Sequence, residues 1–343
     1  MTVFIHNENG VLLAKNVNCN YGRRQHYRLV QCFAEKGMTP MTRLKSVVCH
    51  PDGKALTAQW SDGAQLRFHA IWLRDNAGDP ATRSVENGQR FITLQEIPAD
   101  TRIREANVHE GRLKVYFSPE DKWIDFSETW LLEKSYDKAQ KTEPAWLPGH
   151  ISLWNGSLGL DRVQGAFAAV QTRSDALAAW LTAVEEFGFA TLSGGPRESG
   201  ALLEVVKRFG FVRETNYGRW FEVRSEVAPT NLAYTGLGLQ AHSDNPYRDP
   251  VPTLQILYCL EDAAAGGESF VIDGFAAAKR LQAEDSAGFA LLARYCARFT
   301  YRGRGDVELT ARRPIVELAP DGELIGLRFN NRSMDALTDV PYE

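Results

Sequence analysis

The sequence predicts a mainly β protein with covering helices, in which a small β-rich N-terminal domain precedes a double-stranded β-helix (jelly roll). Three observations predict this class. Short runs of β-branched and aromatic residues recur along the chain, Asp-Gly turns separate several of them, and only a few amphipathic segments interrupt them. The chain has 343 residues, of which 44% are hydrophobic, and this is enough for two domains with cores of ordinary size.

The N-terminal part divides into an extension and a small domain. Residues 1–40 contain a polar, aperiodic stretch at 16–28, so we expect an extension of doubtful origin that is disordered or foreign to the natural protein, with an ordered extension as the alternative. Residues 41–135 read as the small β-rich domain. Asp-Gly turns at 52–53 and 62–63 join predicted strands at 45–49, 55–60 and 64–69, and further strands are predicted at 112–117 and 123–127.

Residues 136–150, which carry charges and two prolines, are predicted to be a linker to a larger domain at 151–343. In that domain, amphipathic patterns predict helices at 174–187, 197–209, 274–283 and 285–295. Strands are predicted at 188–192, 219–224, 253–260, 269–272, 297–301, 315–318 and 324–330. Many strands with a few covering helices favour the jelly roll.

The bulk properties point to a small-molecule ligand. The net charge is −4 and no basic stripe is present, so we expect neither nucleic acid nor an anionic membrane as a partner. No apolar run approaches the length of about 18 residues that a transmembrane helix needs. The five cysteines form no C-x-x-C pair and no signal peptide is evident, which indicates reduced thiols and a cytoplasmic protein.

His242 and Asp244 form the motif that carries chemistry. On a strand, residues two apart point to the same face, so this imidazole and this carboxylate can converge on one cation. Two histidines and a carboxylate on one face of an octahedron are the ligands of non-haem iron(II) oxygenases. Alone, the motif is weak, because a surface histidine beside an aspartate is common. Its context is more specific, since an apolar run at 253–260, Gly266-Gly267-Glu268-Ser269 and a further apolar segment at 271–275 follow it.

Together with WLRDN at 72–76 and LRFNNRS at 327–333, these motifs resemble the γ-butyrobetaine dioxygenase and trimethyllysine dioxygenase branch of the taurine dioxygenase-like Fe(II)/2-oxoglutarate oxygenases. The resemblance runs from about residue 44 to the last residue. It implies an enzyme that uses Fe(II), O2 and 2-oxoglutarate as cosubstrate, with ascorbate as reductant. It also implies that His242 and Asp244 bind the iron, that Ser269 contacts 2-oxoglutarate, and that the protein is a homodimer.

The chain departs from this family in two places. Animal relatives hold a structural zinc with cysteines just after the WLRDN motif, whereas AGDPATRS follows here, so we expect no zinc. The family's distal iron histidine and the arginine that binds 2-oxoglutarate lie beyond the NNR segment, and the sequence stops at Glu343 before both. We therefore expect the domain at 151–343 to be truncated at its C-terminus, with weak iron binding in the chain as given.

The resemblance also assigns a substrate pocket. It places an aromatic cage for a trimethylammonium group on Tyr217, Phe221 and Tyr234, since a quaternary ammonium group donates no hydrogen bond and is bound by aromatic faces. The alternative is that these rings belong to the core. Asn and Tyr donors suit a carboxylate, and an arginine also suits a phosphonate. The candidates for the anionic end of the substrate are Asn231, Asn245, Tyr247, Asn331 and Arg332.

The leading functional hypothesis is therefore hydroxylation of a small quaternary ammonium compound, with γ-butyrobetaine, which gives carnitine, as the first substrate. The phosphonate analogue (2-trimethylaminoethyl)phosphonate is second and trimethyllysine third. One rival is a non-catalytic jelly-roll binding protein that keeps His242 and Asp244 as a relic. The other is a taurine- or sulfonate-type oxygenase, which the aromatic residues of the pocket argue against.

Overall fold

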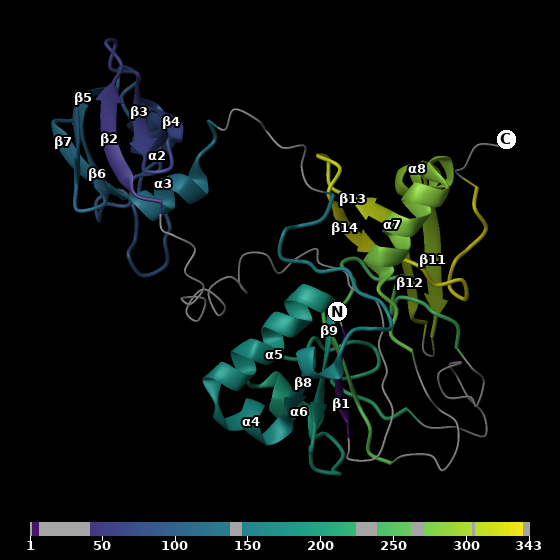
Figure 1. Ribbon diagram of the computed structural model, residues 1–343. Coiled ribbons are helices and arrows are strands. Elements are labelled where there is room, and N and C mark those ends of the chain that lie inside the picture. Colours follow the sequence, from purple (N-terminus) through teal and green to yellow (C-terminus); the bar gives the residue numbers. More distant parts are fainter. Residues whose placement is uncertain are drawn as a thin grey trace. The chain divides into compact units, whose positions relative to one another are not determined.

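The computed structural model describes the backbone of residues 2–6 and all atoms of residues 42–137, 146–223, 239–261, 270–303 and 306–338. The chain forms two compact units (Figure 1). The smaller unit is Lys36–Thr142, and the larger unit combines Met1–Glu35 with Glu143–Glu343. The candidate site lies in the larger unit.

The smaller unit consists of two antiparallel sheets and two short helices. One sheet contains β2 (Leu44–Cys49), β3 (Ala55–Trp60) and β4 (Gln65–His69), and the other contains β5 (Arg102–His109), β6 (Arg112–Ser118) and β7 (Lys122–Ser127). Helix α2 (Ala70–Asp75) follows β4, and α3 (Glu128–Lys134) follows β7; a 3-10 turn, η1 (Leu94–Glu96), lies between them. The inward-facing residues form one core, which includes Trp60, Phe68, Leu73, Leu113 and Phe117.

The predicted hairpins of this unit are confirmed, and β5 is an additional strand. Gly53 has φ +67 in the turn before β3, a conformation that favours glycine. Strand β5 was not predicted from the sequence because its residues are mostly polar and only Ile103 is fully buried. The unit also continues into the predicted linker, since the backbone N–H of His69 donates to the Tyr136 hydroxyl at 2.8 Å.

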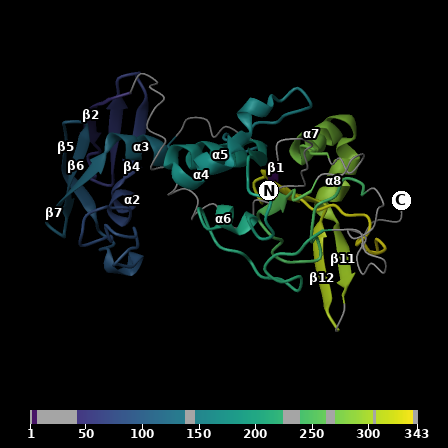
Figure 2. The same cartoon turned by 90° about the horizontal axis from the view of Figure 1, so that it is seen from below.

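A four-stranded parallel sheet forms one part of the larger unit, in the order β10 (Gln255–Tyr258), β1 (Thr2–His6), β9 (Phe189–Ser193), β8 (Gln164–Ala166). Helices α4 (Phe167–Thr172), α5 (Ser174–Phe187) and α6 (Leu202–Val206) accompany it (Figures 1 and 2). The buried face of α5 is formed by Leu177, Trp180, Ala183, Val184 and Phe187. Its predicted bounds are confirmed, because an apolar stripe of this width requires a helix.

Residues 2–6 differ from the expectation that the first 40 residues lie outside the fold. The structure places Thr2–His6 as a strand between β9 and β10, parallel to both. The run Thr-Val-Phe-Ile is rich in β-branched and aromatic residues, as is usual for the inner strands of parallel sheets. The expectation for residues 7–40 lies outside the described residues.

Two hairpins and two helices form the other part of the larger unit. Strand β11 (Cys296–Arg302) pairs with β12 (Glu308–Pro314), and β13 (Val316–Leu318) pairs with β14 (Leu324–Leu327). Helices α7 (Gly274–Glu284) and α8 (Ser286–Arg294) lie beside them in both views (Figures 1 and 2). The Asp273 and Asp285 carboxylates cap these helices by accepting hydrogen bonds from the N–H groups of Ala276 and Gly288. A 3-10 turn, η2 (Leu160–Arg162), precedes β8.

The described residues form five separate sheets of two to four strands, not a closed jelly-roll barrel. The predicted helix at 197–209 is reduced to Leu202–Val206 and flanking turns. Residues 219–223 form no strand, and Trp220, Phe221 and Val223 are exposed. An apolar run becomes a strand only where a neighbouring strand supplies hydrogen bonds, and the described part of the chain offers none to this segment.

Candidate functional site

The His242–Asp244 segment is fastened to the segment that follows β14. The N–H of Ser243 donates to the carbonyl of Phe329 at 2.6 Å, and the N–H of Phe329 donates to the Ser243 hydroxyl at 2.9 Å. The Asn331 amide donates to the Gln240 side chain at 2.8 Å. Two motifs that lie almost 90 residues apart in the sequence are thus brought together by hydrogen bonds. Because Ser243 lies between His242 and Asp244 in the sequence, these hydrogen bonds also anchor the backbone of both candidate ligands.

His242 and Asp244 converge as their spacing predicts. His242 Nε2 lies 3.1 Å from Asp244 Oδ1, and the two side chains are 10% and 29% exposed. The other imidazole nitrogen, Nδ1, lies 2.6 Å from the Gln240 carbonyl. A proton on Nδ1 donated to that carbonyl leaves the Nε2 lone pair available to a metal ion, and this is the usual outer-shell arrangement of a metal-binding histidine.

The pair supplies two ligands of the kind that iron(II) uses. One neutral imidazole nitrogen and one carboxylate oxygen fit two of the three positions of a facial triad. Among the described residues, no cluster of three His, Cys, Asp or Glu side chains lies close enough to hold a metal ion. The residues present therefore fit iron(II) as a partial ligand set.

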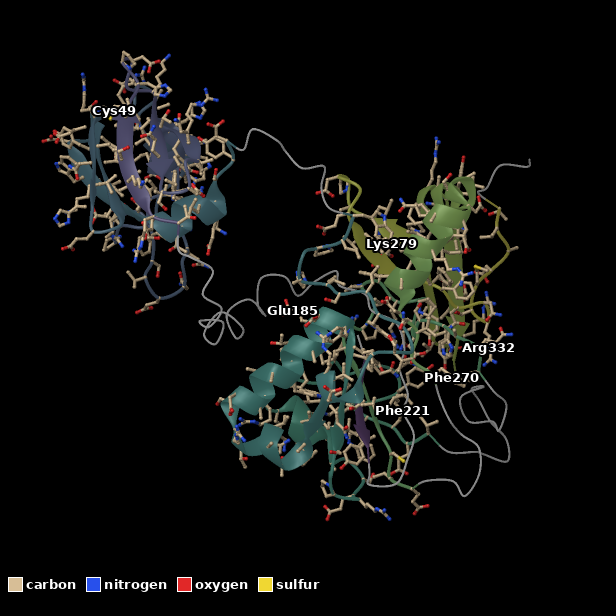
Figure 3. All side chains as sticks on the ribbon, in the orientation of Figure 1. Cys49, Glu185, Phe221, Phe270, Lys279 and Arg332 are labelled. Carbon is tan, nitrogen blue, oxygen red and sulfur yellow. The ribbon has the colours of Figure 1, made fainter. Side chains whose placement is uncertain are left out.

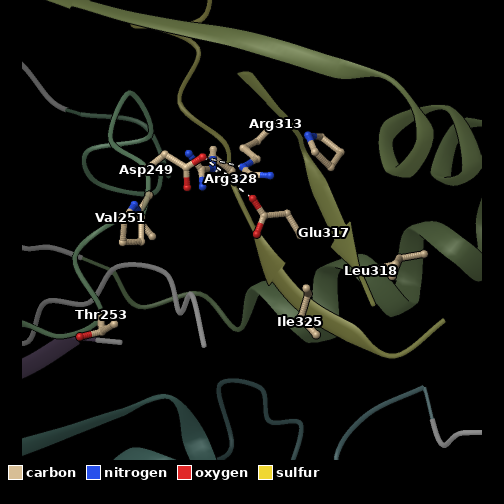
Figure 4. A pocket seen from close by; sticks show the side chains of 10 residues that line it. Asp249, Val251, Thr253, Arg313, Glu317, Leu318, Ile325 and Arg328 are labelled. Atoms are coloured by element: carbon tan, nitrogen blue, oxygen red, sulfur yellow. Dashed lines mark hydrogen bonds and ion pairs between the residues drawn. The ribbon is translucent and has the colours of Figure 1, made fainter. Parts of the chain in front are cut away.

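Arg328 holds the turn that follows the pair. Its guanidinium is 3% exposed and donates through Nη1 to the carbonyls of Pro246 and Arg248, each at 2.9 Å. It also donates through Nε to the Glu317 carboxylate. Nearby, Arg313 donates to Asp249 at 2.5 and 2.9 Å. These four side chains line a pocket of about 180 Å³ (Figure 4).

Four aromatic rings gather beside the same turn. Tyr217 lies 5.3 Å from Phe221 and 5.9 Å from Tyr301, measured between ring centroids, and Tyr247 stacks on Tyr301 at 4.9 Å. The hydroxyls of Tyr217 and Tyr247 are 3.4 Å apart. Tyr301 belongs to β11 and the other three rings belong to loops. We call Tyr217, Phe221, Tyr247 and Tyr301 the aromatic cluster.

The electrostatics of the aromatic cluster tie it to the metal-ligand pair. Burial raises the pKa of Tyr247, and the charge of Asp244 adds to this rise. Burial and the neighbouring Tyr217 hydroxyl raise the pKa of Tyr301 to about 12, while the charge of Arg248 acts in the opposite direction. All the phenols with a raised pKa therefore stay neutral at physiological pH and keep a proton to donate.

Most of the predicted substrate residues lie around this turn. Tyr217, Phe221 and Tyr247 form the aromatic cluster, and Asn245 accepts from Arg248 Nε at 3.2 Å. Asn331 contacts Gln240, and Arg332 is exposed next to it (Figure 3). The positions of Asn231, Tyr234 and Ser269 lie outside the described residues.

Sequence reasoning missed Tyr301, Arg248 and Arg328. Tyr301 lies more than 50 residues after the motif, in a strand whose pattern gives no sign of a site. Arg328 lies inside the motif at 327–333, and Arg248 directly follows the candidate Tyr247; an arginine next to a predicted anion site is a signal that could have identified Arg248. No sequence pattern points to Arg328, because it acts by binding the carbonyls of Pro246 and Arg248, which lie about 80 residues away in the sequence.

Comparison with known proteins gives matches along most of the chain. Residues 155–342 match the family described as taurine catabolism dioxygenase TauD, TfdA family, and residues 47–131 match the gamma-butyrobetaine hydroxylase-like N-terminal family. The chain is 34% identical to the gamma-butyrobetaine dioxygenase of Pseudomonas sp. strain AK-1, over 84% of this chain and 74% of the relative. Identity to the human gamma-butyrobetaine dioxygenase is 27%, over 83% of this chain and 74% of the relative. A trimethyllysine dioxygenase from Meyerozyma guilliermondii is 25% identical, over 85% of this chain and 76% of the relative.

Proposed function

Because the chain belongs to the TauD, TfdA family of Fe(II)/2-oxoglutarate-dependent dioxygenases, in its γ-butyrobetaine and trimethyllysine dioxygenase branch, we propose that it hydroxylates γ-butyrobetaine to carnitine. The family uses Fe(II), 2-oxoglutarate and O2, and its fold is the jelly roll. The observation that carries the proposed substrate is the aromatic cluster, which lies beside the turn that bears His242 and Asp244.

The first supporting argument is the metal site. We assign His242 Nε2 and an Asp244 carboxylate oxygen as two iron ligands, since they face each other at 3.1 Å and the Gln240 carbonyl lies 2.6 Å from His242 Nδ1, where it can accept a hydrogen bond that leaves Nε2 free for the metal. Iron(II) bound at this site together with 2-oxoglutarate would activate O2, which is the oxidant for C–H hydroxylation. The protein's own part is to hold the substrate so that the correct carbon faces this site and water is excluded.

The second argument concerns the cationic end of the substrate. A trimethylammonium group is attracted to aromatic faces, with about 0.5–2 kcal/mol per contact depending on desolvation. Tyr217 and Phe221 offer two faces at a ring separation of 5.3 Å. Tyr247 and Tyr301 pack in the same cluster, so four rings contribute aromatic surface to which a small cation is attracted. We expect Tyr234 to join them and Ser269 to contact 2-oxoglutarate.

The anionic end leaves two substrates to compare. Asn231, Asn245, Asn331 and Arg332 are the proposed donors together with Tyr247, and such a set suits a carboxylate or a phosphonate. The 34% identity to a gamma-butyrobetaine dioxygenase favours the carboxylate. The exposed Arg332 keeps (2-trimethylaminoethyl)phosphonate as the second candidate.

The test is turnover of the full chain with Fe(II), 2-oxoglutarate, ascorbate and oxygen. Succinate and hydroxylated product are measured with γ-butyrobetaine, with its phosphonate analogue and with taurine. Product from γ-butyrobetaine in equal amount to succinate supports the proposal, and product from the phosphonate alone selects the second candidate. Succinate with taurine alone would place the chain with the sulfonate oxygenases. No iron binding and no product with any substrate would favour the non-catalytic binding protein.

Three further features belong to the proposal. We propose a cytoplasmic homodimer whose small unit holds together without zinc. In the small unit, Arg74 donates to both Glu120 oxygens at 2.6 and 2.7 Å, and Lys122 lies 2.7 Å from Asp79. These ion pairs fasten the segment after the WLRDN motif. No helix among the described residues reaches the length and apolarity that crossing a bilayer would demand.

A further inference from the structure

Arg248 is an arginine beside the aromatic cluster that is held by neutral groups. Its Nε donates to Asn245 Oδ1 at 3.2 Å, and an Nη group donates to Asn216 Oδ1. Its backbone N–H donates to the carbonyl of Asn245 at 3.0 Å. The guanidinium is thus oriented by two amide oxygens from two different loops, and neither of them cancels its charge.

Two other arginines of this region, Arg328 and Arg313, differ in this respect. Arg328 is paired with Glu317 at 3.2 Å, and Arg313 is paired with Asp249 at 2.5 Å. In the described parts of the chain, no carboxylate forms an ion pair with Arg248. A half-buried guanidinium of this kind retains a net positive charge that a bound anion can neutralise.

The position of that charge is fixed before any ligand binds. Arg328 donates to the carbonyls of Pro246 and Arg248, so the turn cannot shift without breaking buried hydrogen bonds. Asn245 has φ 52 in this turn, in the left-handed region that asparagine tolerates better than most residues. A donor that is already in place loses little conformational entropy on binding.

The positive charge of Arg248 also affects the hydroxyl groups of Tyr247 and Tyr301. It lowers the pKa of Tyr247 and of Tyr301, against the larger effect of burial. The guanidinium therefore lies near the Tyr247 and Tyr301 phenols, and its hydrogen bond to Asn216 also brings it next to the loop that carries Tyr217, whose ring packs on Phe221. A cation placed on the rings of Tyr217 and Phe221 is repelled by Arg248, and an anion tethered to that cation is attracted to it.

We propose that Arg248 binds the anionic end of the substrate and thereby sets the orientation in which a zwitterionic quaternary ammonium compound enters the site. This rests on the proposed function, and it names a specificity-determining residue for it. The trimethylammonium group lies against Tyr217 and Phe221, and the carboxylate or phosphonate accepts hydrogen bonds from the guanidinium, assisted by the Tyr247 and Tyr301 hydroxyls. Quaternary ammonium compounds without an anionic group bind in no fixed direction and are poor substrates.

The test compares two ligands that differ only in the anionic group. Binding of γ-butyrobetaine and of butyltrimethylammonium, in which a methyl group replaces the carboxylate, is measured by calorimetry on the full chain without oxygen. We expect Arg248→Gln to weaken γ-butyrobetaine binding by about 10- to 100-fold, which is the range for one hydrogen-bonded charge, and to leave butyltrimethylammonium binding within about 2-fold. Arg248→Lys should fall between the parent and Arg248→Gln, because it keeps the charge but not the planar fork.

Arg302→Gln is the matched control. Arg302 is the next residue after Tyr301 on β11, its side chain is 75% exposed, and it pairs with Glu308. The Arg302→Gln substitution removes the same charge close to the aromatic cluster. It should change neither the affinity for γ-butyrobetaine nor the affinity for butyltrimethylammonium. Equal losses for both ligands in Arg248→Gln, or no loss for γ-butyrobetaine, would overturn the role of Arg248. A parent chain that binds neither compound would instead overturn the proposed substrate class.

Discussion

Arg328 and Glu317 form an ion pair in which both side chains are almost completely enclosed, with Nε and Oε1 3.2 Å apart and side-chain exposures of 3% and 6%. Burial raises the pKa of the Glu317 carboxyl, and the charge of Arg328 opposes that rise. Burial likewise lowers the pKa of Arg328. The pair lies under the turn that carries the candidate metal ligands, because the same guanidinium binds the carbonyls of Pro246 and Arg248.

Arg328→Met should destabilise the larger unit by about 3–5 kcal/mol, since it leaves the Glu317 carboxylate buried without its partner. The measurement is chemical denaturation followed by tryptophan fluorescence. The double variant Arg328→Met with Glu317→Leu should recover part of the loss, because no buried charge then remains. Arg302→Met, at an exposed position, is the control. A loss below about 1 kcal/mol for Arg328→Met would contradict this account.

Ser243→Ala should cost about 1–2 kcal/mol of stability, because the Phe329 N–H loses its acceptor in a buried contact. It should also weaken Fe(II) binding several-fold, since Ser243 positions the residues on either side of it. Calorimetric titration with Fe(II) and a thermal melt measure the two effects. Ser46→Ala removes an exposed hydroxyl that bonds to Gln59, and it should change neither quantity. Unchanged iron affinity in Ser243→Ala would show that the ligand pair needs no such support.

His242→Ala and Asp244→Ala should each reduce Fe(II) affinity by at least about 10-fold, because each removes one of the two proposed iron ligands. Anaerobic calorimetry measures this directly and needs no turnover. His150→Ala is the matched control, since this imidazole is 44% exposed and lies within 4.0 Å of Glu185. Equal iron binding in the parent and in His242→Ala would remove the metal site from the proposal.

Tyr301→Phe and Tyr301→Leu should separate the ring of Tyr301 from its hydroxyl. The Phe variant keeps the ring that stacks on Tyr247, so binding of a quaternary ammonium cation should change by less than about 2-fold. The Leu variant removes a π face, so the dissociation constant should rise by about 3- to 10-fold. Calorimetry with butyltrimethylammonium measures both. Identical affinities for the two variants would assign Tyr301 to packing alone.

Asp79→Asn should change how the small unit responds to acid. Burial raises the pKa of Asp79, but the hydrogen bond and charge of Lys122 outweigh it, so the pKa lies below its ordinary value of 3.8. A lowered pKa in the folded state adds stability above the ordinary pKa, and this is lost as the pH falls through the folded value. At neutral pH the variant should therefore be less stable by about 1–3 kcal/mol.

The acid unfolding curve distinguishes this cause from general damage. The difference between the parent and Asp79→Asn should shrink as the pH falls below the ordinary pKa of 3.8 and through the lower pKa of the folded state, where the carboxylate of the parent becomes protonated. Asp100→Asn, which changes an exposed carboxylate in the same unit, should follow the parent at every pH. A stability difference that is independent of pH would show that the charge of Asp79 contributes nothing.

Several elements were decided by the local sequence. Strand β3 and helix α5 form within the predicted bounds, because Asp-Gly turns and an apolar stripe of helical period act over a few residues. The convergence of His242 and Asp244 was also predictable, since two residues on one face of an extended segment must lie close together. The motifs of the family, each a short run of residues that can be recognised without the structure, likewise identified the chemistry.

Other features depended on contacts between distant segments. Thr2–His6 joins a sheet because β9 and β10 both pair with it, one on each side. No local sequence pattern predicts which strands will be neighbours in a sheet. Tyr301 joins Tyr217 and Tyr247 only because β11 passes their loops. Arg248 and Arg328 look alike in the sequence, yet one is held by amide oxygens and the other by a buried carboxylate. The charge that a side chain presents depends on its partners, and the partners are chosen by the tertiary structure.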